Sequence, residues 1–248
     1  MKQNSYVRII SIIVVVAAAI MVGLFFFQQW RSDKGEETYQ EIRKETKKET
    51  KQKAAHDFEQ LQKQNADIYA WIQVPNTKVD YPVLQSEEDN FYLSRDINKQ
   101  NSKPGSIYSN SCNSKDMEDA ITILYGHDMK AHTMFGSLHL FDDPDFFEEN
   151  ETILVETPQE LRTYSIYGVF NYNDNYIPSV FSVTEAQGAQ DFIDSLEECA
   201  KEGDKLTHVR QGETLTADDK ILVLSTCISG QDDRRFLVVA KLTNRDKY

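Results

Sequence analysis

The chain has 248 residues, of which 40 are acidic and 27 basic, giving a net charge of −13 at pH 7. After residue 56 there are 17 basic and 34 acidic residues, a net charge of −17. So acidic a domain is a poor candidate for binding nucleic acid, which selects clustered lysine and arginine, and the length allows one domain plus an appendage.

The appendage is at the amino terminus, where residues 9–27 form an apolar run without a single charged side chain. As a helix that rises about 1.5 Å per residue, this run spans about 28 Å, close to the thickness of the bilayer hydrocarbon. Lys2 and Arg8 precede it, which favours an amino terminus left in the cytoplasm. We therefore expect a cytoplasmic stub over 1–8 and a transmembrane signal anchor over 9–30.

A cleaved signal peptide is the alternative, because Ala17–Ala19 are small residues of the kind found at a cleavage site. The run remains apolar through residues 25–27, however, and nothing polar follows the alanines. We favour the uncleaved anchor, which predicts that the rest of the chain lies outside the cell, tethered to the membrane.

Residues 31–56 are rich in charge and show no apolar stripe. Glu41, Glu45 and Glu49 recur at intervals of four, with lysines three residues after the first two, a spacing that supports an exposed helix. We expect a solvated helical stalk here, followed by a folded domain over 57–248.

From residue 71 onward the pattern consists of short apolar, β-branched runs separated by Pro, Gly, Asn and Asp. The expected strands are Trp71–Val74, Tyr81–Leu84, Ser106–Ser109, Ile121–Tyr125, Thr152–Thr157, Leu161–Asn171, Lys220–Thr226 and Phe236–Leu242. Eight short strands with few helices predict a mainly β fold that closes, or nearly closes, into a barrel.

Three helices are expected around these strands. An amino-terminal helix begins at about residue 57, with Phe58 and Leu61 on one face. A short helix is predicted over 132–140, and a longer one over 184–201 lies between the sixth and seventh strands.

Reactive and charged side chains follow three of the predicted strands. Cys227 comes directly after one apolar run, His127 comes shortly after another, and Arg234 and Arg235 open the last. A thiol at a strand end can face solvent while the sheet holds its backbone. Since neighbouring strand residues point to opposite faces, only one of the two arginines can face the thiol. The pattern predicts a thiol active site at one rim of the sheet.

The segments that carry these residues resemble sortase signatures. Leu224-Ser225-Thr226-Cys227 is similar to the core of the signature Thr-Leu-x-Thr-Cys, with Val223 in place of its first Thr. Tyr125-Gly126-His127 resembles the sortase histidine segment, and Arg235–Ala240 resembles the strand that bears the arginine. Further segments resemble the opening of a class B sortase domain: Asn65–Ile72, Val74–Thr77, Asp80–Gln85, Asn90–Leu93 and Gly105–Tyr108.

This resemblance implies a closed eight-stranded β-barrel with an amino-terminal helix and a helix between strands 6 and 7, as class B members have. It implies that Cys227 is the nucleophile that forms a thioester and that His127 exchanges protons with the leaving and incoming amines. Arg235, which stands five residues before Ala240 as in the family, would hold the oxyanion or the peptide. Arg234 remains the alternative for that role.

The resemblance also implies a substrate and its contacts. Positions that line the class B peptide groove correspond to Leu93, Tyr176, Ile177 and Ser225, and Thr226 belongs to the signature itself. The expected reaction cleaves a sorting motif near the carboxyl terminus of a secreted protein, after Thr, and passes the acyl group to an amine of the cell-wall peptide in a Gram-positive host. No cofactor is expected.

Other readings of the function stay open. A pilin lysine could serve as the acceptor amine, or water could resolve the thioester as in a cysteine protease. A non-catalytic, membrane-tethered binding module on the same barrel is the alternative from another class, although such a module has no need of a Cys, a His and an Arg together.

Several titratable residues are weaker candidates. His127 and His132 are five apart but lack a third metal ligand at a suitable spacing, so no metal site is expected. Asp128 or Asp233 could orient His127 as the acid of a triad. His139 and His208 are expected at the surface, and the acidic stretch 142–149 lacks the pattern of a calcium loop. Whether Cys112 and Cys199 pair is open, and we expect both to be free.

Overall fold

The computed structural model describes residues 16, 20–24, 37–44 and 55–248. The expected stub over 1–8, most of the anchor over 9–30 and parts of the stalk over 31–56 lie outside the described residues. Within the described ranges, no helix combines the length and the apolar character needed to cross a membrane.

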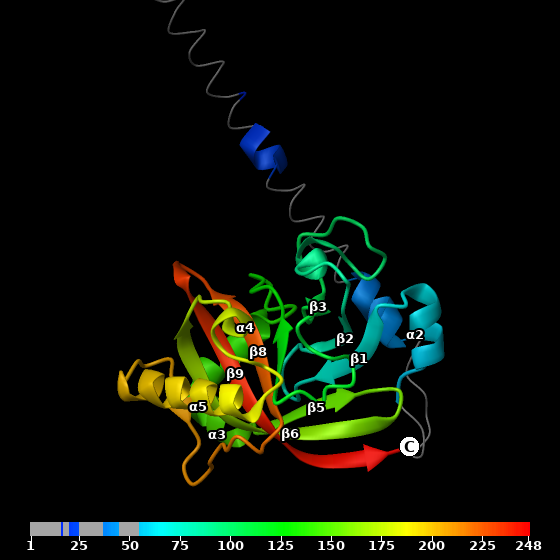
Figure 1. Ribbon diagram of the computed structural model, residues 1–248. Coiled ribbons are helices and arrows are strands. Elements are labelled where there is room, and N and C mark those ends of the chain that lie inside the picture. Colours follow the sequence, from blue (N-terminus) through cyan, green and yellow to red (C-terminus); the bar gives the residue numbers. More distant parts are fainter. Residues whose placement is uncertain (1–15, 17–19, 25–36, 45–54) are drawn as a thin grey trace, which may run out of the picture.

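Figure 1 shows β8 and β9 to the left of β1 and β2, and all four belong to a closed ring of eight strands. The order in the ring is β5-β1-β2-β3-β4-β8-β9-β6, and β6 pairs back to β5 to close the ring. A ninth, two-residue strand, β7, attaches to β6. The strands are β1 Ile68–Gln73, β2 Asp80–Leu84, β3 Ile107–Tyr108, β4 Ile121–Tyr125, β5 Thr152–Glu156, β6 Glu160–Asn173, β7 His208–Val209, β8 Ile221–Ile228 and β9 Gln231–Lys247. The predicted mainly β fold and its eight-stranded barrel are confirmed.

The strands on one side of the barrel are buried on both faces. Side chains of β8 and β9 alternate between a core inside the barrel and a second core beneath a helix, α5 Ala186–Lys201. The first core takes Leu222, Leu224, Phe236, Val238 and Ala240, and the second takes Ile221, Val223, Leu237 and Val239. Burial on both faces explains why these strands read as unbroken apolar runs in the sequence.

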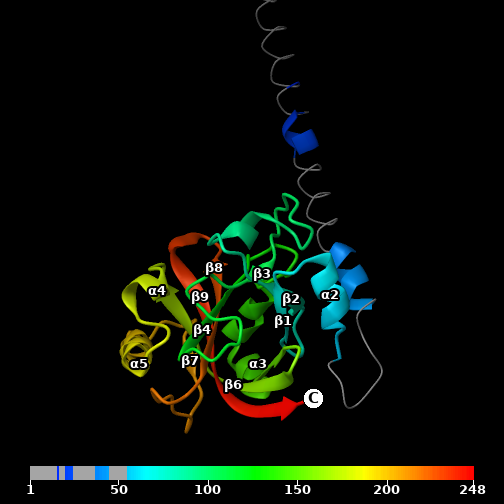
Figure 2. The same ribbon diagram turned by 45° about the vertical axis from the view of Figure 1, so that its right-hand side comes forward.

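The outer helices agree with the sequence in two places of three. The helix α2 Phe58–Gln64 is capped by Asp57, whose carboxylate accepts from the amide of Gln60. The helix α5, which lies between β6 and β8 in the chain, covers the second core (Figure 2). Both confirm the expected helices. A further short helix, α4 Ile177–Val180, was not expected from the sequence.

The helix expected over 132–140 is wrong in its first half. His132 and Met134 have φ angles of 55° and 54°, left-handed values that no α-helix contains. The chain instead forms a 3-10 helix, η2 Gly136–Asp142, and then α3 Pro144–Glu149, whose first turn is capped by Asp143. Met134, Phe135 and Leu138 are nevertheless buried in the barrel-side core, whereas Leu140 is exposed.

The expectation of a solvated stalk is wrong for residues 37–44. These residues are helical, and Tyr39 and Ile42 are buried in the barrel-side core. The hydroxyl of Tyr39 donates to the carbonyl of Gly105 at 2.9 Å and lies 2.8 Å from the Ser106 hydroxyl. Two apolar residues three apart form too narrow a face to register as a stripe among so many charges, and Arg43 adds an ion pair with Asp80 at 3.8 Å.

Candidate active site

Strand register brings His127 and Cys227 to one rim of the barrel. β4 and β8 are parallel, and their last pair joins Tyr125 to Ser225. The amide of Gly126 continues this ladder by donating to the carbonyl of Ser225 at 3.2 Å. His127 and Cys227 each lie two residues beyond that last pair, so they stand at the same level of the rim, His127 just after β4 and Cys227 still within β8.

A hairpin adds the arginine. Cys227 pairs with Arg235 across β8 and β9, directly before a bulge between Cys227 and Ile228. The two arginines occupy opposite faces, as strand geometry requires: Arg235 lines the cavity beside Cys227, whereas Arg234 donates to the carbonyl of Asn171 at 3.4 Å. Of the two arginines, only Arg235 lines the cavity that the described residues form beside Cys227, and its role stays a prediction.

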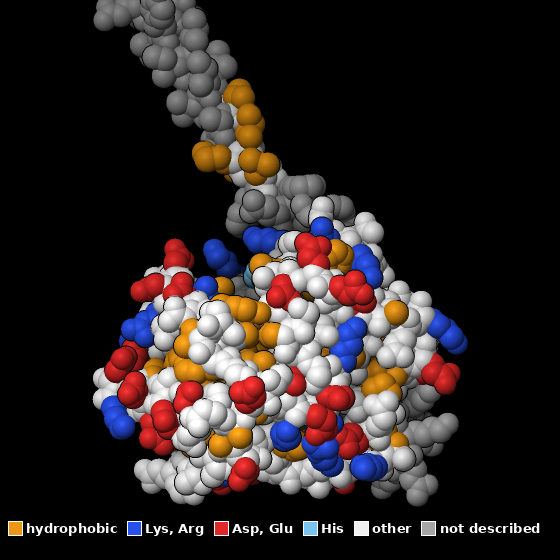
Figure 3. Space-filling view, viewed as in Figure 1, with side chains coloured by type: hydrophobic (Ala, Val, Ile, Leu, Met, Phe, Trp, Pro, Cys, Tyr) orange, Lys and Arg blue, Asp and Glu red, His pale blue; other side chains and the backbone are white. Residues whose placement is uncertain are grey.

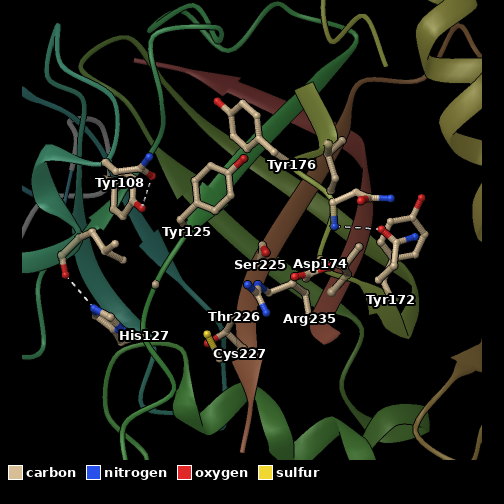
Figure 4. Close-up of a pocket in the computed structure, with 17 residues that line it drawn as sticks. Tyr108, Tyr125, His127, Tyr172, Asp174, Tyr176, Ser225, Thr226, Cys227 and Arg235 are labelled. Carbon is tan, nitrogen blue, oxygen red and sulfur yellow. Dashed lines mark hydrogen bonds between the residues drawn. The ribbon is translucent and has the colours of Figure 1, made fainter. Parts of the chain in front are cut away.

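The guanidinium of Arg235 is held from one end. Its Nη1 donates to the carbonyls of Asp232 at 3.0 Å and Arg234 at 2.7 Å. Within the described residues its Nε and Nη2 make no hydrogen bond, so their N–H groups are available to a ligand in the cavity. Figure 4 shows the guanidinium on one side of Cys227 and the ring of His127 on the other.

His127 is oriented by a backbone carbonyl. Its Nε2 lies 2.7 Å from the carbonyl oxygen of Leu93, in the 3-10 helix η1 Phe91–Ser94. A carbonyl can only accept, so Nε2 carries a hydrogen and Nδ1 is the atom free to exchange a proton. Neither of the acids considered for a triad orients His127. Asp128 accepts from the Ser229 hydroxyl at 2.7 Å, and Asp233 is exposed. The Leu93 carbonyl could not be found from the sequence, because backbone atoms carry no sequence signal.

These residues surround one cavity of about 340 Å³. All eight candidates from the sequence line it: Leu93, His127, Tyr176, Ile177, Ser225, Thr226, Cys227 and Arg235. Figure 3 shows the surface of the molecule from the same side as Figure 1. Hydrophobic side chains gather there over the region where Figure 1 shows α4 and β8. A mostly apolar pocket with a few convergent polar groups is typical of a binding site for an organic ligand.

Three tyrosines that the sequence analysis did not single out complete the wall. Tyr108 stacks on Tyr125 with ring centroids 5.5 Å apart, and Tyr125 stacks on Tyr176 at 6.5 Å. Tyr172 lies on the other side of the cavity (Figure 4). Burial raises the pKa of Tyr176 to about 12 and that of Tyr125 further, so both phenols keep their hydrogens at neutral pH.

Two buried hydroxyls of the wall are unsatisfied. Neither the Tyr125 hydroxyl nor the Thr226 hydroxyl has a hydrogen-bond partner within the part of the chain that the structure describes. Buried polar groups without partners are rare in folded proteins, and at a cavity they are suited to bind a ligand that carries its own donors and acceptors. A peptide backbone is such a ligand.

The three cysteines, all in described segments, are free thiols. Cys227 is exposed, Cys199 is buried and Cys112 is half-buried. Burial raises the pKa of the Cys112 and Cys199 thiols, which disfavours their reactive thiolate forms. Cys227 is therefore the thiol best placed for chemistry.

The expectation of surface positions for His139 and His208 is wrong. The His139 side chain is only 17% exposed, and its Nε2 lies 3.0 Å from the carbonyl oxygen of Cys227. His208 reaches the carbonyl of Asp142 at 3.1 Å and packs on Phe147. Among the described residues, no group of three or more His, Cys, Asp and Glu side chains is arranged to hold a metal ion.

Comparison with known proteins gives the family. The model of the sortase domain matches residues 72–243. Sortase B of Staphylococcus aureus is 29% identical, the match covering 98% of this chain and 98% of that protein. Among solved structures, a Staphylococcus aureus sortase B–substrate complex superposes with a TM-score of 0.71 and 28% identity, covering 86% of this chain and 98% of that one. A Bacillus anthracis sortase B has a TM-score of 0.72 and 26% identity, covering 89% and 100%.

The agreement extends over fold, sequence and site. The family model spans the barrel from β1 into β9, and the strands in that span position a cysteine, a histidine and an arginine around one cavity. The chain belongs to the sortase family of cysteine transpeptidases and is a class B sortase.

Proposed function

We propose that this sortase is anchored in the cell membrane with its barrel outside the cell. There it cleaves a sorting motif near the carboxyl terminus of secreted proteins, after a Thr, and transfers the acyl group to an amine of the cell-wall peptide. The observation that carries the proposal is the convergence of Cys227, His127 and Arg235 on a peptide-sized cavity. The similar Staphylococcus aureus structure is of a substrate complex, which supports a peptide ligand.

The first half-reaction begins with Cys227 as the thiolate and His127 with hydrogens on both ring nitrogens, and the sulfur attacks the carbonyl carbon before the scissile bond. The carbonyl oxygen becomes an oxyanion, and the Nε and Nη2 hydrogens of Arg235 are placed to donate to it. His127 gives its Nδ1 proton to the leaving amine as the carbon–nitrogen bond breaks. The products are a thioester on Cys227 and a released carboxyl-terminal peptide.

In the second half-reaction, an acceptor amine attacks the thioester carbonyl. His127, now with a lone pair on Nδ1, takes the proton that the amine loses, while Arg235 again faces the oxyanion. The carbon–sulfur bond breaks, Cys227 is regenerated, and a new amide links the secreted protein to the acceptor. Water in place of the amine would give hydrolysis.

The proposed substrate contacts divide into two kinds. Leu93 and Tyr176 are 42% and 40% exposed, which is unusual for large apolar side chains beside a cavity and suits residues covered by a bound peptide. Ile177, Ser225 and Thr226 are buried and form the wall behind it.

Membrane attachment rests on the anchor over 9–30, whose apolar run covers 9–27. We propose the cytoplasmic stub over 1–8, that anchor, a charged helical stalk over 31–56 of which residues 37–44 pack on the barrel, and a catalytic domain over 57–248. Sortases are associated with the cell surface, which agrees with such an anchor. The acidic domain would be repelled by an anionic membrane, so the anchor must supply the attachment.

The experiment uses the full-length protein in detergent with a library of short peptides that contain Thr, read by mass spectrometry. Cleavage after Thr, together with ligation to an added cell-wall peptide amine, supports the proposal. Preferential ligation to a lysine side chain of a pilin-like peptide would indicate the pilus reaction instead. Cleavage to the free acid alone, with every amine tested, would contradict transpeptidation.

A further inference from the structure

His139 lies beneath the strand that carries the nucleophile. It belongs to η2, and its ring packs on Phe236 with centroids 4.7 Å apart. Its Nε2 lies 3.0 Å from the carbonyl oxygen of Cys227, and its Nδ1 lies 3.3 Å from a carboxylate oxygen of Asp142. One ring thus connects an acid of its own helix with the main chain of the reactive cysteine, 88 residues away.

The bulge at the end of β8 explains why that carbonyl needs such a partner. The register of β8 and β9 shifts between Cys227 and Ile228, so the regular ladder is interrupted at the carbonyl of Cys227. A carbonyl that leaves the ladder has to find its donor elsewhere, in a side chain or in water. His139 supplies the donor from outside the sheet.

The two contacts together select the charged form of the ring. Both ring nitrogens face acceptors, a carbonyl on one side and a carboxylate on the other, and a neutral imidazole has only one N–H to offer. Asp128 adds a second carboxylate, 4.0 Å from Nε2. Burial by itself lowers the pKa of His139, but the hydrogen bonds to Asp142 and to the Cys227 carbonyl outweigh it and hold the pKa above its ordinary value.

Asp128 ties the same loop to the hairpin a second time. Its carboxylate accepts from the hydroxyl of Ser229, in the turn after Cys227, at 2.7 Å. The segment from Asp128 to His139 begins directly after His127. The loop that carries the general acid–base residue and the hairpin that carries the nucleophile are therefore joined at two points.

We propose that protonated His139 is a positioning residue, which fixes the main chain of Cys227 relative to His127 and is supported in this by Asp142 and Asp128. The proposal rests on the proposed role of Cys227 as nucleophile. When His139 loses its proton, one of its two hydrogen bonds must break: the ring loses either its bond to the Cys227 carbonyl or the Asp142 contact that orients it, and in both cases the hairpin is held less firmly. Acylation therefore declines as pH rises through the pKa of His139.

The test compares the full-length wild type with His139→Gln, which cannot be charged, and Asp142→Asn, which keeps its shape but loses the charge that holds the proton. His132→Gln is the matched control, because His132 is exposed in the same loop. At pH 7, the rate of thioester formation at saturating peptide is expected to fall about 10-fold or more in His139→Gln, the scale of a small misplacement of reacting groups. KM should change little, and His132→Gln should match the wild type.

A pH profile separates positioning from ordinary structural support. The alkaline decline in acylation should move to lower pH in Asp142→Asn, because the ring gives up its proton more readily. Nitrogen-15 spectra of the imidazoles report the protonation of His139, whose signal is assigned as the one missing from His139→Gln. In the wild type at pH 7 this signal should show that both ring nitrogens are protonated. A neutral His139 at pH 7, an unmoved profile in Asp142→Asn, or wild-type acylation by His139→Gln would each overturn the proposal.

One readout needs no substrate. Amide hydrogen exchange in the 227–231 turn should be faster in His139→Gln and Asp142→Asn than in the wild type or in His132→Gln, with the rest of the barrel unchanged. Unaltered exchange in that turn would contradict the proposal. A wild type that forms no thioester with any peptide would instead contradict the proposed function, while exchange and spectra still report on His139.

Discussion

Replacing Gly126 with alanine should slow the reaction and weaken the fold, because a methyl group has no room there. A Cβ at this position would lie 2.5 Å from Cδ1 of Ile107 and 2.8 Å from two ring carbons of Phe135. Carbon atoms pack at about 3.5–4.0 Å, so the nearest contact is roughly 1 Å too short. Ile107 and Phe135 are fully buried and have no solvent to swing into.

The magnitude follows from this overlap. Extra volume in a packed core costs about 1–3 kcal/mol, and the melting temperature of a domain this size falls about 2–4 °C for each kcal/mol. Gly126 directly precedes His127 and donates to Ser225, so part of the strain must move the histidine. A displacement of roughly 1 Å at a catalytic group lowers the rate up to about 10²-fold. Gly126 does not have a positive φ, so the effect is steric.

The assay pairs thermal melting with thioester formation, and Ile107→Val is the internal control. Valine removes Cδ1, the nearest atom, at a cost of about 0.5–1.5 kcal/mol on its own. The double variant should therefore lose less stability than the two single losses combined. Strict additivity, or a Gly126→Ala variant with wild-type rate and melting temperature, would refute the reasoning.

Three further predictions concern other parts of the chain. Arg235→Lys should lower the rate of thioester formation about 10²-fold, the scale of losing one oxyanion donor, because lysine lacks the planar fork of donors. Arg234→Lys should stay within a few-fold of the wild-type rate. A reversed pattern in single-turnover kinetics would show that Arg234 holds the substrate. Deleting residues 1–31 should give a soluble domain that still cleaves peptide. In that domain, Ile42→Ala should lower the free energy of unfolding, measured by urea titration, by about 2 kcal/mol. Equal stability of the two forms would show that residues 37–44 contribute nothing to the fold. The pKa of His139 is raised in the folded state, so protonation of His139 stabilises the wild type relative to His139→Gln. This difference in the free energy of unfolding should be largest below about pH 6.5 and should disappear as pH rises through the folded-state pKa. A difference that grew with pH would contradict the raised pKa.

The sequence predicted the barrel because its strands obey local rules. All eight expected strands exist, and those buried on both faces were the clearest, since their side chains are apolar without interruption. The register of these strands brings Cys227, His127 and Arg235 together, because Cys227 and Arg235 pair across β8 and β9 and His127 lies two residues after β4, which is parallel to β8.

What the sequence could not show depends on contacts between distant segments. Left-handed φ angles at His132 and Met134 end the expected helix, yet neither residue is a glycine or an asparagine that would have indicated them. The docking of residues 37–44 depends on Tyr39 meeting a carbonyl 66 residues away. His139 was taken for a surface residue because its partner is a backbone atom of a distant strand.

The most direct test of the account is to look for the acyl-enzyme itself. The wild type is mixed with a cleavable peptide, quenched in acid within one turnover, and examined by intact mass and peptide mapping. The account predicts an adduct on Cys227 with the mass of the acyl fragment, which an acceptor amine removes faster than water does. In Cys227→Ala, both the adduct and peptide cleavage should be absent. Cleavage that persists in a folded Cys227→Ala variant, or an adduct on Cys112 or Cys199 instead, would contradict it.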